Sequence, residues 1–162
     1  MKWLVLMALA LSGAALAGPK YDFLFETGDG YGVIYTVRRG LLERDESRAS
    51  EPSRHPARLY LYETATDRFR EVSFEDARRL KLVVTMDPPK STAESPDGFR
   101  VVRIEPTSHD PVSAAASTAA LKIRGIDSRY FYLEKGSFRR KLTLPADSSD
   151  FYNPVVLGWV PR

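Results

Sequence analysis

Short runs of aromatic and β-branched residues alternate with Gly, Pro and Asp turn signals along most of this chain, and this alternation limits the fold more than any other feature. Residues 21–26 and 31–38 are two such runs on either side of Gly28-Asp29-Gly30. Runs of this composition around a Gly/Asp turn are typical of a β-hairpin. We therefore expect the two runs to pair, in a sheet covered on both faces because both faces carry bulky side chains.

The remaining runs predict more strands and one short helix. Residues 58–63 and 68–72 suit a second hairpin. Ser73 suits the N-cap of a helix over 73–80, because Asp76 follows three residues later. Further strands are expected at 81–86, 99–105, 121–126, 130–133, 138–144 and 155–160. The predicted class is all-β: antiparallel hairpins forming a small sandwich or two propeller-blade-like sheets, with one short helix near 73–80.

Two polar stretches lack the apolar periodicity of packed elements. Residues 42–57 and 106–120 are expected to be mobile loops that folding does not require. The Ala/Ser tract at 113–120 suits a loop or one weak helix, and composition does not separate these two readings.

The first seventeen residues have the three parts of a secretory signal peptide: Lys2, an apolar run, and a small-residue ending at Ala15 and Ala17. The apolar run is shorter than the roughly 20 residues that a spanning helix needs. We expect cleavage after Ala17, a single mostly-β domain over 18–162, and a periplasmic or secreted location with no remaining transmembrane anchor.

The residue types exclude several chemistries. The chain has no Cys and only 2 His, so disulfides, thiol nucleophiles and Cys- or His-based metal sites are not expected, and no cofactor motif is present. The formal net charge of +3 is spread along the chain, and with export this argues against nucleic acid as a partner. Consecutive Ser108-His109-Asp110 cannot form a catalytic triad, which is assembled from distant segments.

One internal echo stands out. The segment 58–63 (RLYLYE) is echoed by 129–134 (RYFYLE), and a turn and a Phe-Arg pair follow each of them. With the Ser95-Pro96-Asp97-Gly98 turn and the RRKLT strand at 139–143, the chain resembles the TolB-type β-propeller repeats of bacterial periplasmic proteins.

This resemblance implies about two blades, one of them built from 31–37 with 58–72, and a first strand of a further blade at 153–159. Closed propellers use about four to eight blades. The implied structure is therefore a pair of packed blade-like sheets, or an open fragment that closes by self-association into a larger ring.

Neighbouring strands of the two echoed hairpins carry tyrosine and arginine, the residue types that anchor protein interfaces. The candidate binding residues are Tyr60, Tyr62, Arg68, Arg70, Tyr130, Tyr132, Arg139 and Arg140. The alternative is that these tyrosines fill sheet faces. We expect Leu59 and Leu61 to form the more buried face, because a tyrosine hydroxyl is easier to leave in water than to satisfy in a small sandwich.

The function expected from these observations is a non-catalytic binding protein of the bacterial envelope, with a protein or an envelope glycan as partner. The alternative is a small envelope hydrolase that uses a pair of carboxylates, which needs spatial and not sequential proximity. Glu63 and Glu134 occupy equivalent positions of the echo, which favours a structural role at the strand ends. A cleft holding two carboxylates would favour the hydrolase.

Overall fold

A computed structural model describes residues 18–84, 94–103, 117, 119–122, 130–145 and 154–162. The strands are β1 (Tyr21–Thr27), β2 (Gly32–Arg38), β3 (Leu41–Arg48), β4 (Arg58–Glu63), β5 (Arg68–Val72), β6 (Arg100–Arg103), β7 (Phe131–Lys135), β8 (Phe138–Lys141) and β9 (Val155–Pro161), with helix α1 (Phe74–Arg78) between β5 and β6. The predicted all-β class with a short helix near 73–80 is confirmed.

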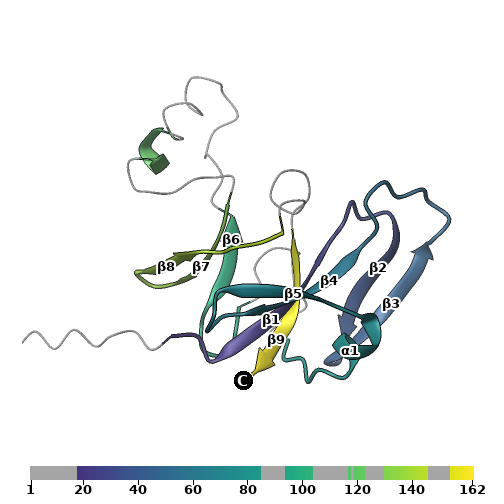
Figure 1. Cartoon of the computed structure of the whole chain (residues 1–162), viewed down its shortest axis with the longest axis horizontal. Helices are drawn as coiled ribbons and strands as arrows, with labels where there is room; N and C mark the ends of the chain where they lie inside the picture. Colours follow the sequence, from purple (N-terminus) through teal and green to yellow (C-terminus); the bar gives the residue numbers. More distant parts are fainter. Residues whose placement is uncertain (1–17, 85–93, 104–116, 118, 123–129, 146–153) are drawn as a thin grey trace, which may run out of the picture.

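The strands form three antiparallel sheets that lie in layers (Figure 1). The central sheet has the order β5-β4-β1-β9, and a three-stranded sheet, β6-β7-β8, covers one of its faces. The β2-β3 pair and α1 cover the other face. Because the central strands are covered on both sides, β1 and β4 carry apolar residues at consecutive positions instead of alternating with polar ones.

The expected pairing of 21–26 with 31–38 is wrong, although both strands form. β1 pairs with β4 and β9, while β2 pairs with β3. The backbone between them takes conformations that favour glycine, with φ of 153° at Gly28 and 74° at Gly30. Both edges of β1 are paired, with β4 and with β9, so β2 lies in the next layer, where the Tyr35 amide reaches the Glu26 carboxylate.

The expected loop at 42–57 is wrong over its first half, which is strand β3. Arg39 and Gly40 both have positive φ, 52° and 77°, as a two-residue type I′ hairpin turn requires. Buried Leu42 is the one apolar anchor of an otherwise charged strand. Charged side chains on an outer strand hide the period-two signal, because only one position in this strand needs to be buried.

The echoed segments both form hairpins, as predicted. β4 and β5 pair around residues 64–67, and β7 and β8 pair around Gly136, whose φ is 54°. The Ser95–Gly98 turn is also present: the Ser95 hydroxyl accepts a hydrogen bond from the Phe99 amide at 2.8 Å. Ser73 caps α1 by accepting from the Asp76 amide at 3.1 Å.

Two other expected strands differ from the structure. In the segment 81–86, Val83 makes an isolated bridge to Trp159, and residues 85–86 lie outside the described residues. Leu121 and Lys122 are helical, not extended, and they continue from Ser117, Ala119 and Ala120. The rest of the expected loop at 106–120 lies outside the described residues, so its expected mobility stays a prediction.

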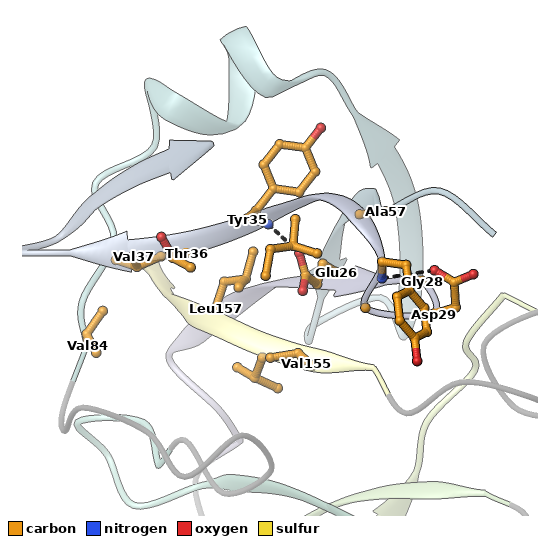
Figure 2. A pocket seen from close by; sticks show the side chains of 14 residues that line it. Glu26, Gly28, Asp29, Tyr35, Thr36, Val37, Ala57, Val84, Val155 and Leu157 are labelled. Carbon is orange, nitrogen blue, oxygen red and sulfur yellow. Dashed lines mark hydrogen bonds between the residues drawn. The ribbon is translucent and has the colours of Figure 1, made fainter. Parts of the chain in front are cut away.

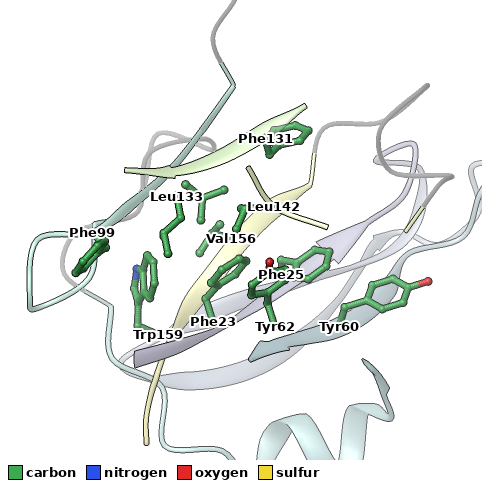
Figure 3. Packing of buried hydrophobic residues seen from close by; sticks show 11 residues of the cluster. Phe23, Phe25, Tyr60, Tyr62, Phe99, Phe131, Leu133, Leu142, Val156 and Trp159 are labelled. Carbon is green, nitrogen blue, oxygen red and sulfur yellow. The ribbon is translucent and has the colours of Figure 1, made fainter. Parts of the chain in front are cut away.

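The main core lies between the central sheet and the β6-β7-β8 sheet (Figure 3). The side chains that fill it include Phe23, Phe25, Tyr60, Tyr62, Phe131, Leu133 and Trp159. Tyr62 stacks on Phe23 with ring centroids 4.8 Å apart. A second core on the other face contains Leu24, Leu42, Leu59, Leu61 and Ala77.

The last strand, β9, forms one edge of the central sheet. β9 pairs antiparallel with β1, so Tyr21 lies opposite Pro161 and the two ends of the domain are neighbours. Residues 153–159 were expected to begin a further blade. Their strand, β9, instead belongs to the same sheet as β1, β4 and β5. The blade expected from 31–37 with 58–72 is not present, because β1 and not β2 lies beside β4.

Candidate functional site

The predicted Tyr face is not a surface. Tyr60 is 4% exposed and Tyr62 is fully buried, so the expectation that they lie outside a more buried Leu59/Leu61 face is wrong. Both faces of β4 are buried because the central sheet is the middle layer. The hydroxyl of Tyr62 donates to the Asp67 carboxylate, which satisfies it inside the fold.

The tyrosines of the second echo are also unsuited to a contact face. Tyr132 is 4% exposed. Tyr130 is half-buried, and the Lys141 ammonium lies 3.2 Å from its ring centroid. The echoed tyrosines thus act in packing.

The four arginines do not gather at one place. Arg140 extends between the layers and donates to the Thr64 carbonyl at 2.8 Å. Arg139 pairs with Glu134 at 3.1 Å on the outside of the β6-β7-β8 sheet. Arg68 and Arg70 lie exposed on β5, at the edge of the central sheet. The structure therefore does not bring the eight predicted residues together.

A pocket of about 490 Å³ lies elsewhere, between β2, β9 and the Gly28–Gly30 turn (Figure 2). Its volume is within the range of about 300–1,000 Å³ that is typical of ligand sites. Aliphatic side chains form most of its wall: Ile34, Val37, Ala57, Val84, Val155, Val156 and Leu157. Tyr31, which is 46% exposed, also lines it.

The pocket meets β2 along its edge. Four consecutive residues of β2, Ile34 to Val37, line it. Successive side chains of a strand point to opposite faces. A cavity that touches four residues in a row therefore lies along the hydrogen-bonding edge of the strand and not on one of its faces.

Glu26 is the acidic group at the inner end of this pocket. It follows Leu24 on the face of β1 that turns toward β2, and it is half-buried. Its carboxylate accepts a hydrogen bond from the Tyr35 amide at 2.8 Å, which Figure 2 shows as a dashed line. A side chain of the central sheet therefore satisfies a backbone donor at the edge of β2.

Asp29, at the tip of the turn, holds the neighbouring loop. Its carboxylate accepts hydrogen bonds from the Ser53 hydroxyl at 2.8 Å and from the amides of Tyr31, Arg54 and His55. Desolvation raises the pKa of this carboxyl, but the hydrogen bonds outweigh it and lower the pKa to about 2.

The pocket does bring two carboxylates to one cavity, which is the arrangement that the hydrolase hypothesis asked for. A glycosidase general acid needs a raised pKa so that it holds a proton at working pH. Asp29 has the opposite shift, and its oxygens are already used by four donors. Glu63 and Glu134 lie in different sheets and pair with Arg70 and Arg100 respectively.

The charge of the pocket is one-sided. Glu26 and Asp29 are acidic, and none of the described residues that line the cavity is Lys, Arg or His. Among the described residues, no group of three or more His, Asp or Glu side chains could hold a metal ion. The arrangement suits an apolar group that carries a positive charge.

Comparison of the chain with protein-family models, with curated proteins and with solved structures finds no match. Within the described residues, no helix has the length and apolar character to cross a membrane.

Sequence reasoning missed the pocket residues. The sequence predicts a simple hairpin turn at Gly28-Asp29-Gly30 and a strand that ends at Glu26. Glu26 gave no distinct signal, because Asp22 lies on the same face of this strand and is also acidic.

Proposed function

We propose that this chain is an exported, non-catalytic binding protein of the bacterial envelope whose ligand enters the pocket between β2 and β9. The observation that carries the proposal is the lining of that cavity: aliphatic walls, two carboxylates and no cationic side chain among its described residues. The ligand class is an apolar group that bears a positive charge. Aliphatic walls offer little to the hydroxyl groups of a glycan, so an apolar ligand is favoured over a sugar.

Burial of apolar groups and electrostatic attraction both favour binding of a cationic alkyl ligand in this pocket. Burial of alkyl groups contributes about 0.8 kcal/mol for each CH₂. A unit charge about 4 Å from a carboxylate adds roughly 1 kcal/mol in water-like surroundings and about 4 kcal/mol near a protein surface. Attraction of a cationic alkyl ligand and repulsion of its anionic counterpart therefore differ by at least about 2 kcal/mol, which favours the cation by roughly thirtyfold.

The test uses octylammonium and octanoate, which have matched chain lengths and opposite charges, with binding measured by calorimetry. We expect octylammonium to bind and octanoate to bind more weakly. Ile34→Trp places an indole at a pocket-lining position of β2 and is expected to remove binding. Val102→Trp is the matched control, because Val102 is a half-buried β-branched residue in β6 and does not line the pocket.

Glu26→Gln keeps an acceptor for the Tyr35 amide and removes the charge. We expect it to reduce the preference for octylammonium without abolishing it, because Asp29 keeps its charge, while leaving the melting temperature close to that of the parent protein. If the parent protein binds neither octylammonium nor the peptide described below, or if Ile34→Trp folds and binds as the parent does, the proposed function is wrong.

A further inference from the structure

One hydrogen-bonding edge of β2 pairs with β3, and the opposite edge does not. In a two-residue hairpin the residues flanking the turn, here Arg38 and Leu41, form a hydrogen-bonded pair. Counting back in twos, Thr36 and Ile34 also bond to β3. The peptide groups of Tyr35 and Val37 therefore face the opposite side, and the Tyr35 amide shows this directly, because it donates to Glu26.

This edge of β2 adjoins the pocket. Among the described strands β2 pairs with β3 alone. At Tyr35 the Glu26 carboxylate oxygen, 2.8 Å from the amide, occupies the place that a carbonyl of a further strand would take. In the described part of the chain, no other segment forms a ladder with β2 at Val37.

We propose that the occupant of the pocket is an extended peptide segment of a partner protein, which adds a strand to the edge of β2. This inference rests on the proposed function and names its ligand class. Strand addition combines main-chain hydrogen bonds, which hold the peptide, with side-chain pockets, which select it. The aliphatic wall of β9 (Val155 and Leu157) supplies the side-chain contact.

Two of the other outer strands, β3 and β8, are poorer templates. β3 carries Glu43, Arg44 and Glu46 as exposed charges, and β8 carries exposed Arg139 and Lys141. Charged side chains on an edge strand discourage pairing with another chain. The pocket-lining residues of β2, Ile34 to Val37, contain no charged side chain.

The negative charge of Glu26 also limits which peptide sequences are expected to bind. A peptide carbonyl that bonds to the Tyr35 amide displaces the Glu26 carboxylate, which then loses this backbone donor. A lysine or arginine on the peptide places a positive charge near that carboxylate and so favours a basic peptide. The expected ligand is thus a short alternating segment of small aliphatic residues with one basic residue.

The experiment uses the peptide Lys-Val-Thr-Val-Thr-Val, acetylated and amidated at its ends, with protein purified from cells that express the full chain. Its matched control is the same peptide with N-methyl groups on alternate amides, which blocks one hydrogen-bonding edge and keeps charge and side chains. Affinity is measured by calorimetry, and amide hydrogen exchange of the protein by NMR. Octylammonium is measured in parallel.

We expect the unmodified peptide to bind, to slow exchange of the Val37 amide by about tenfold or more, and to leave the amides of β3 unchanged. N-methylation is expected to weaken binding by about tenfold for each hydrogen bond lost. Equal binding of the two peptides, protection at β3 in place of β2, or binding of octylammonium without the peptide overturns strand addition and leaves the small-ligand pocket standing. Failure of both the peptide and octylammonium overturns the proposed function as well.

Discussion

Tyr62 provides the sharpest test of the central sheet. Its ring is fully buried, stacks on Phe23 at 4.8 Å, and carries a hydroxyl that donates to Asp67. Truncation of a large aromatic side chain in a core costs about 3–5 kcal/mol, and a stacked pair adds about 0.5–1.5 kcal/mol. The hydroxyl adds about 1 kcal/mol, below the roughly 1.5–3 kcal/mol of a bond to a charged group, because the Asp67 side chain is 37% exposed and water can replace the hydroxyl as its partner.

Tyr62→Ala is therefore expected to lower the free energy of unfolding by about 4–6 kcal/mol, since these contributions overlap in part. Domains of this size have a total of about 5–15 kcal/mol, so the variant should be close to unfolding at room temperature. Tyr62→Phe keeps the ring and is expected to cost about 1 kcal/mol.

Urea denaturation measures both variants, and the fluorescence of Trp159 reports it because this indole lies in the same core, 5.3 Å from the Phe23 ring. Tyr31→Ala is the control, because Tyr31 is 46% exposed; we expect a change below about 1 kcal/mol there. A loss below about 1 kcal/mol for Tyr62→Ala would refute the burial of the β4 tyrosines and restore the contact face that the sequence predicted.

Three further predictions concern the turn, the layer contact and the N-terminus. The pKa of Asp29 is held at about 2, below its unfolded value of about 3.9, so its contribution to stability is present above about pH 4 and is lost as the pH falls toward 2. NMR titration should show this low pKa, and Asp29→Asn should flatten that part of the stability profile; a carboxyl titrating near pH 4 would contradict it. Arg140→Ala removes the bond to the Thr64 carbonyl that joins two layers and should lower the free energy of unfolding by about 1–3 kcal/mol, whereas Arg139→Ala, whose ion-pair partner Glu134 keeps Arg100, should cost below about 1 kcal/mol; equal effects in urea melts would show that the layer contact is absent. The mature protein should begin at Gly18 and be found in the periplasm, and mass spectrometry of exported protein that retains Met1 in the membrane fraction would refute this.

Local patterns in the sequence predicted the elements whose partners are close along the chain. The β4-β5 and β7-β8 hairpins, the Ser73 cap and the Ser95–Gly98 turn were all predicted correctly. Each is set by residues within a few positions of one another, where turn conformation and capping bonds depend on side chains that the sequence shows directly.

Strand β3 shows where local patterns are insufficient. Residues 42–48 are mostly charged, and they form a strand because an adjacent type I′ turn aligns them with β2. Leu42 is the apolar residue of this segment that is buried. A hydrophobic period cannot reveal a strand that contributes a single residue to a core.

The sequence by itself determined that this chain is built from antiparallel β-hairpins with one short helix, because strand propensity, turn residues and capping are local properties. Only the tertiary structure decided that β1 pairs with β4 and β9, that both faces of this sheet are covered, and that Tyr60 and Tyr62 are core residues. It also placed Glu26 beneath β2 at the pocket. The physical reason is that layer order depends on contacts between residues far apart in the chain, and a residue's own pattern does not say which sheet will cover it.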